Sequence, residues 1–187
     1  MRDIENFPPV ATGFATVADV CRTFKQDMKS LYLLSLLLTA GQHTAEQCFV
    51  SSLGDCLDMR PVFEEWTDSW TRRIVLQNAI RILSPTVNNA DASLRSPLSP
   101  LDSDLNPALR AVIRLDTFER FVFVMTVLEG YSDRECSLLL RSSKRDVLAA
   151  KTKALEHLST TSGSNEVPVT TPAERQFTAM AKRESML

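Results

Sequence analysis

Two basic side chains stand next to each other at a predicted helix start near residue 144. Lys144 and Arg145 follow Ser143, and Asp146 comes three residues after that serine. A serine paired with an acidic residue at this spacing is typical of a helix start, because each side chain can bond a backbone N–H of the other. The free backbone N–H groups in the first turn of a helix attract anions. Cationic side chains at the same place can therefore bind a phosphate together with these N–H groups. The pattern therefore predicts a phosphate-binding helix start of the kind that suits a nucleic-acid backbone.

The residues around this helix start add further cations to a chain that is slightly acidic overall. Residues 132–158 hold six Lys and Arg against four Asp and Glu, six minus four giving +2, whereas the whole chain carries −2. Lys151 and Lys153 follow further along the same helical pattern, within reach of a phosphate backbone. Any contact with nucleic acid must come from this local patch, because no global positive field attracts the chain. A solvated basic helix face that binds nothing is the alternative interpretation.

The positions that would meet base edges carry few hydrogen-bonding groups. They hold Asp146, Leu148, Ala149 and Ala150, whereas readout in the major groove ordinarily uses donors such as Arg, Lys and Asn. Asp146 would repel phosphates if it faced them, but it stabilises the helix start if it bonds Ser143. Leu148 and the alanine methyl groups can pack on thymine methyl groups.

Other kinds of chemistry find no support in the residue pattern. We find no nucleophile–base set, glycine-rich phosphate loop or metal-ligand spacing, and His43 and His157 stand alone. The cysteines lie far apart without a CxxC pair, which favours buried free thiols in a reducing cytoplasm over zinc or disulfides; they are Cys21, Cys48, Cys56 and Cys136. We therefore expect no enzyme activity, no metal and no cofactor.

The elements that must position the basic residues are helices. Five glycines in 187 residues and an abundance of Leu, Ala and Val favour helix over sheet. Apolar periodicity predicts one helical pattern from Val17 into the run at 31–38, a helix from Thr44, and later helices over 67–83, 107–115 and 117–129. Residues 132–140 and 143–158 then form two helices with a tight corner between them, which is a helix-turn-helix. Cap pairs mark helix starts at Thr44 with Gln47, Asp116 with Glu119, Ser132 with Glu135, and Ser143 with Asp146.

The composition changes sharply over residues 84–107, which are rich in Ser, Pro, Asp and Asn and lack periodicity. So long a structureless stretch is natural as a linker between domains. We therefore expect an all-α protein with two small helical domains joined by a flexible linker, the second ending in the helix-turn-helix. The expected layout is a disordered leader at 1–15, a first domain at 16–83, the linker at 84–107, a second domain at 108–158 and a mobile tail at 159–187.

No stretch of the sequence predicts contact with a membrane. The run LYLLSLLLTA at 31–40 is strongly apolar, but it is much shorter than the roughly 20 residues that span a bilayer. Some 30 residues, among them Lys25, Asp27 and Lys29, come before the run, which is not the layout of a signal peptide. We expect a cytoplasmic protein.

Two parts of the sequence resemble a known family. They are FVFVMTVLEGYSDRECSLLL at 121–140, followed by VLAAKTKALEHL, and in the first half LYLLSLLLTAGQHTAEQCF and WTRRIVLQNAIRIL. These stretches resemble regions four and two of the extracytoplasmic-function sigma factors of bacterial RNA polymerase. The resemblance covers most of residues 28–83 and 108–158 and is most specific around 121–140. It implies a non-catalytic protein that directs RNA polymerase to promoter DNA for transcription initiation.

The resemblance also implies which residues meet each partner. The helix after Ser143 would enter the major groove at the upstream promoter element, and Trp70 to Arg81 would face the upstream edge of the melting promoter. The DNA contacts would be Ser143, Lys144, Arg145, Lys151, Lys153, Arg72 and Arg73. Residues 45–57 would dock on the clamp coiled coil of the polymerase core, through Glu46, Gln47, Phe49 and Val50. An anti-sigma protein is a further partner that membership of the family would allow.

The DNA-reading positions diverge from the family pattern. Residues that are usually Thr, Lys, Ser and Arg fall on Asp146, Leu148, Ala149 and Ala150. A degenerate sigma-like protein, acting as a protein-interaction regulator without sequence-specific DNA binding, is therefore an alternative. A small helical scaffold unrelated to transcription is a third.

Overall fold

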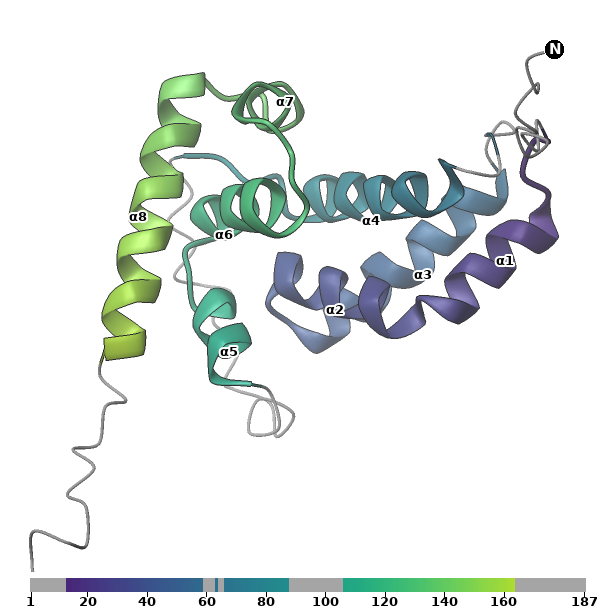
Figure 1. Ribbon diagram of the computed structural model, residues 1–187, viewed down its shortest axis with the longest axis horizontal. Helices are drawn as coiled ribbons and strands as arrows, with labels where there is room; N and C mark the ends of the chain where they lie inside the picture. Colours follow the sequence, from purple (N-terminus) through teal and green to yellow (C-terminus); the bar gives the residue numbers. More distant parts are fainter. Residues whose placement is uncertain (1–12, 59–62, 64–65, 88–105, 164–187) are drawn as a thin grey trace, which may run out of the picture.

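The computed structural model describes residues 13–58, 63, 66–87 and 106–163. In these residues the chain is all-helical, which confirms the predicted fold class, and one isolated bridge joins Phe14 to Phe63. The helices are α1 (Val17–Gln26), α2 (Met28–Thr39), α3 (Gln42–Asp58), α4 (Thr67–Leu83), α5 (Pro107–Ile113), α6 (Thr117–Phe123), the π-helical segment η4 (Val124–Leu128), α7 (Asp133–Leu139) and α8 (Lys144–Gly163). Figure 1 shows α1 to α4 on one side of the molecule and α5 to α8 on the other.

The N-terminal half is a packed group in which α2, α3 and α4 contact one another and α1 contacts all three. The leucine run of α2 makes this packing possible, because a helix that is apolar on most sides can be covered by several neighbours. Leu31 and Leu38 of α2, Cys48 of α3, and Val75 and Ala79 of α4 are completely buried.

The C-terminal half is built around α6 and η4, whose side chains from Phe118 to Met125 are all buried. Helix α8 packs against α6, α7 and α5 and crosses the end of α6 in the view of Figure 1. Gly130, in the left-handed region at φ 73°, ends the α6–η4 segment, as predicted. The buried α6–η4 segment therefore supplies the surface against which α8 packs.

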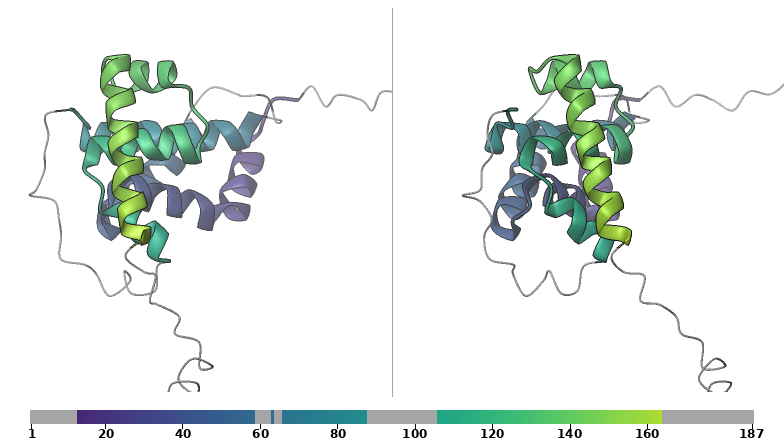
Figure 2. Two further views of the ribbon diagram at one scale, coloured as in Figure 1. Left: turned by 60° about the vertical axis from the view of Figure 1, so that its left-hand side comes forward. Right: turned by 90° about the vertical axis from the view of Figure 1, so that its left-hand side faces the viewer.

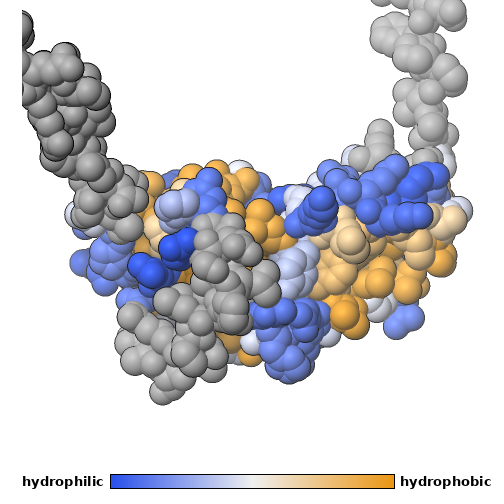
Figure 3. Space-filling model, turned by 90° about the horizontal axis from the view of Figure 1, so that it is seen from below, coloured by the Kyte–Doolittle hydropathy of each residue, from blue (hydrophilic) through white to orange (hydrophobic). Residues whose placement is uncertain are grey.

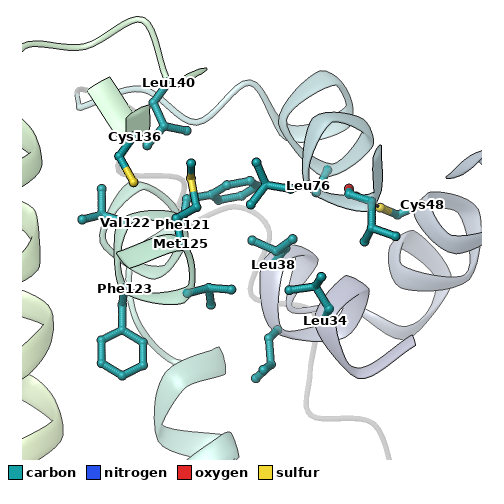
Figure 4. Packing of buried hydrophobic residues seen from close by; sticks show 14 of the residues in the cluster. Leu34, Leu38, Cys48, Leu76, Phe121, Val122, Phe123, Met125, Cys136 and Leu140 are labelled. Atoms are coloured by element: carbon teal, nitrogen blue, oxygen red, sulfur yellow. Dashed lines mark hydrogen bonds between the residues drawn. The ribbon is translucent and has the colours of Figure 1, made fainter. Parts of the chain in front are cut away.

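The two halves share one apolar cluster. Leu38 and Leu76 of the first half and Phe121 and Met125 of the second belong to it (Figure 4). Helix α2 also contacts α5 and α6 directly. Residues 88–105, the centre of the predicted linker, lie outside the described residues, as do most of the predicted leader at 1–15 and of the predicted tail at 159–187. The division into two domains stays a prediction.

Arg120 of α6 is a charged side chain inside this junction. Its guanidinium donates to the carbonyl oxygens of Leu115 at 2.9 Å, Leu38 at 3.2 Å and Ile113 at 3.3 Å. Burial lowers the pKa of Arg120 to about 10, so the group remains charged at neutral pH. Because Leu38 lies in the last turn of α2, this side chain satisfies carbonyls that two helix ends leave free.

Three predicted helix boundaries are wrong. The pattern predicted as continuous from Val17 to residue 38 breaks at Asp27, where the chain leaves helical geometry and separates α1 from α2. Helix α3 begins at Gln42, because Ala40 ends α2 in the left-handed region and the Ala45 N–H already bonds Gly41 O. Thr44 thus lies inside the helix rather than capping it. Helix α8 continues to Gly163, beyond the predicted end at residue 158.

The prediction of buried cysteines holds for three of the four. Cys48, Cys56 and Cys136 are buried free thiols, and burial raises the pKa of Cys56 to about 12. Cys21 is exposed on α1, so the prediction is wrong for this residue. The periodicity placed it next to Val20, but only Val20 and Phe24 of α1 face the core.

We predict that Arg120→Met lowers the free energy of unfolding by about 2–4 kcal/mol, because buried carbonyls that lose their only strong donor cost about 1–3 kcal/mol each. Urea unfolding followed by circular dichroism measures this loss. Arg114→Met is the matched control: Arg114 is exposed, and its loss should change stability by less than about 0.5 kcal/mol. Equal effects of the two substitutions would contradict the role assigned to Arg120.

Candidate nucleic-acid interface

Helices α7 and α8 form the predicted corner. Arg141 adopts the left-handed region at φ 49°, and the Ser142 N–H reaches back to Ser137 O at 3.0 Å. A left-handed conformation costs a non-glycine residue about 1 kcal/mol, so the surrounding contacts must hold it. The buried side chains of Cys136, Leu140 and Val147 lie at this corner and do so. The pair has the arrangement of a helix-turn-helix, in which the second helix is the one that can enter a DNA groove.

Capping boxes hold the starts of both helices. Ser132 donates to the carboxylate of Glu135 from its N–H at 2.9 Å and from its hydroxyl at 2.7 Å. Ser143 donates to the carboxylate of Asp146 from its N–H at 3.3 Å and from its hydroxyl at 2.6 Å, and the Asp146 N–H donates to the Ser143 hydroxyl at 3.1 Å. Both predicted cap pairs are confirmed. The Asp146 carboxylate is therefore committed to the helix start.

The predicted cap pair of Asp116 with Glu119 is wrong, as is that of Thr44 with Gln47. Asp116 occupies the N-cap position of α6 without a capping hydrogen bond from its side chain. Glu119 instead turns toward α8, where its carboxylate lies 3.3 Å from the Lys153 Nζ and 3.5 Å from the His157 Nδ1. Glu119 is buried because α8 covers this face of α6. Local spacing could not reveal a partner 34 residues away along the chain.

The cations at the start of α8 are exposed. Ser143, Lys144 and Arg145 lie at the surface, and neither cation forms an ion pair with another residue of the described part of the chain. Viewed from the side of α8, this helix lies in front of the other described helices (Figure 2, right). The described helices of the N-terminal half do not cover it. Among the described residues, Lys144 and Arg145 are therefore accessible to a rod-like anion.

The other two predicted cations of α8, Lys151 and Lys153, each face a carboxylate. Lys151 is half-buried, with its Nζ 3.4 Å from Asp133, and Lys153 is exposed beside Glu119. Ion pairs near the surface contribute about 0–1 kcal/mol, so Lys151 can exchange Asp133 for a phosphate at small cost. Lys153 faces the buried carboxylate of Glu119, so its release would cost more. These two residues are secondary candidates for the interface.

The structure does not bring Arg72 and Arg73 of α4 together with the cations of α8. Arg72 donates from Nε to Glu129 at 2.8 Å and from Nη1 to the Ser30 hydroxyl at 2.9 Å. The hydrogen bond to Glu129 raises the pKa of Arg72, and the carboxylate of Glu129 is almost completely buried. Arg73 is exposed and remains available. Sequence analysis missed this link between the halves, because Glu129 and Ser30 carry no local signal for it.

The four residues predicted to bind polymerase lie on α3. Glu46, Gln47 and Val50 are exposed, Val50 by 66 % of its surface. Phe49 is half-buried, with its ring 5.7 Å from that of Phe24 and 6.2 Å from that of Tyr32. The surface around Val50 is therefore partly apolar. Seen from below, the molecule also shows an apolar area over the half that holds α1 and α2 (Figure 3).

Fold and site together define an all-helical chain with a helix-turn-helix whose second helix presents an exposed cationic start. A scan against protein-family models and a search of the curated proteins found no significant match for this chain. None of the described helices combines the length and the apolar character needed to cross a membrane. The described residues also contain no group of three or more His, Cys, Asp or Glu side chains that could hold a metal ion.

The Ser132 capping box predicts an observable titration. Its hydrogen bonds hold the pKa of Glu135 below the ordinary value of 4.5, so its contribution to stability is present above that value and is lost as pH falls through the lowered one. Ser132→Ala removes the hydroxyl and should move the pKa of Glu135 up toward 4.5, as measured by carboxyl carbon NMR. Ser137→Ala is the control, because the Ser137 hydroxyl bonds Arg134 O instead. An unchanged Glu135 titration in Ser132→Ala would contradict the capping geometry.

Proposed function

We propose that this chain is a sigma-factor-like protein that directs RNA polymerase to promoter DNA, without catalytic activity of its own. The single observation that carries the proposal is the exposed start of α8, where Lys144 and Arg145 stand free of ion pairs within the described part of the chain. The helix-turn-helix behind it and the family resemblance of residues 121–140 support the same function.

The electrostatics of this surface favour a polyanion. Phosphates would meet the first turn of α8 together with Lys144 and Arg145, which fixes the register of the helix on the duplex. The carboxylates of Asp146 and Glu135 accept hydrogen bonds at the two helix starts, and neither forms an ion pair with Lys144 or Arg145. Lys151 and Lys153 extend the positive edge along the helix.

The surface of α3 supports the polymerase part of the proposal. An exposed Val50 beside the exposed polar residues Glu46 and Gln47 forms a small apolar centre with a polar rim, which is typical of protein interfaces. Helix α3 lies in the opposite half of the molecule from α8 (Figure 1). Polymerase and DNA could therefore be bound at the same time.

A second candidate function is a protein-interaction regulator that lacks sequence-specific DNA binding. The observation in its favour is the exposed apolar surface of the corner itself, where Leu138 is 70 % exposed and Leu148 is 45 % exposed. Such a protein would bind polymerase or another partner, and its affinity for DNA would be weak and insensitive to changes at α8.

Replacing Lys144 and Arg145 together by alanine tests the phosphate contacts. We expect weaker duplex binding by a similar factor for all sequences, and a salt dependence whose slope falls by about two, one for each lost contact. Fluorescence anisotropy titrations at several salt concentrations measure both quantities.

The matched control is Lys25→Ala with Lys29→Ala, which removes the same charge from exposed positions in α1 and α2. This variant should keep the wild-type salt slope. A slope that is unchanged in the Lys144 and Arg145 variant would exclude the proposed contacts and favour the second candidate.

Val50→Asp tests the polymerase surface. Burying a charge at an interface centre should weaken association with polymerase core at least about tenfold, or about 1.4 kcal/mol, while the melting temperature stays unchanged. Co-purification with core and surface plasmon resonance measure this loss. Val17→Asp makes the same change at a similarly exposed position of α1 and should bind like the wild type. Equal binding by both variants would place the polymerase contact elsewhere.

A further inference from the structure

One side of α8 is buried and the other is free. Val147, Ala150 and Ala154 of this helix are buried. Leu148, Ala149 and Thr152 are exposed and lie within the first three turns, directly after Lys144 and Arg145. In a helix-turn-helix it is this part of the second helix that reaches the base edges, because the first turns of the helix enter the groove.

Leu148, Ala149 and Thr152 carry methyl groups, and none of the three has a free hydrogen-bond donor. Leu148 and Ala149 have none, and the hydroxyl of Thr152 already donates to Leu148 O at 3.1 Å. Guanine is read mainly through Arg or Lys, and adenine mainly through Asn or Gln. Thymine is the base that offers an apolar group in the major groove, its C5 methyl. Ala and Thr are side chains that ordinarily contact that methyl group.

The charges around these residues favour DNA over an apolar protein partner. Exposed Arg134 and Arg141 flank the corner in addition to Lys144 and Arg145. A purely apolar partner would have to desolvate these cations, whereas two phosphate backbones on either side of a major groove would pair with them. The apolar side chains of α8 would thus face the thymine methyl groups in the groove, and the cations beside them would face the phosphates.

We propose that α8 selects promoter DNA through thymine methyl groups, with Leu148 as the principal reader and Ala149 and Thr152 beside it. The inference rests on the proposed DNA-binding function and names the base that the site recognises. Preferred sites should therefore be rich in A·T pairs at the positions that α8 covers. Loss of one contacted methyl group should weaken binding roughly fourfold, the value of one buried carbon.

Deoxyuridine provides the decisive test, because it differs from thymidine only by the missing methyl group. Duplexes are first selected from a randomised library with the full-length chain at low salt, and each thymine of the selected site is then replaced by uracil. We expect a fourfold loss of affinity at one or two positions. This substitution is made in the DNA, so the folding of the protein is not affected.

Leu148→Ala should abolish the uracil penalty at one of these positions. Leu155→Ala is the matched control, since Leu155 is 47 % exposed against 45 % for Leu148 and lies two turns further along the helix. The control should keep the full penalty.

If the selected sites bind with no uracil penalty, or if Leu148→Ala keeps that penalty, thymine reading by Leu148 is excluded while DNA binding stands. If no duplex is enriched at all, the proposed function fails as well.

Discussion

The packing of α8 on α6 is the constraint on which the rest of the candidate site depends. A helix with one apolar stripe must bury that stripe, and Val147, Ala150 and Ala154 do so against the wholly buried segment that contains Phe121 and Val122. The opposite side of α8 must then face solvent. The exposure of Lys144 and Arg145 is a geometric consequence of this packing, since they precede the buried stripe at the open end of the helix.

Charged groups lie at the junction between the two halves. Arg120 bonds carbonyls from both halves, and the Arg72–Glu129 pair joins α4 to the end of η4. A buried charge is tolerated only where such partners surround it, so these contacts restrict how the halves can pack. They also separate two neighbouring arginines by role: Arg72 is held inside this junction, and Arg73 is left at the surface.

The acidic residues near α8 are arranged so that its start keeps a local positive character in a chain of net charge −2. Asp146 and Glu135 accept hydrogen bonds at the helix starts, and Glu119 of α6 is buried under α8 with Lys153 beside it. Capping therefore contributes to stability and to the surface charge at the same time. None of these three carboxylates forms an ion pair with Lys144 or Arg145, and both cations are exposed at the start of α8.

The sequence by itself determined the helical class, the span of α4, the starts of α7 and α8 and the corner between them. These features depend on periodicity and on cap pairs such as Ser132 with Glu135, which act within a few residues of chain. Only the tertiary structure decided the break at Asp27, the inward turn of Glu119 and the use of Arg72 as a link to Glu129. The roles of Glu119 and Arg72 depend on neighbours that are distant in sequence, and local spacing carries no information about them.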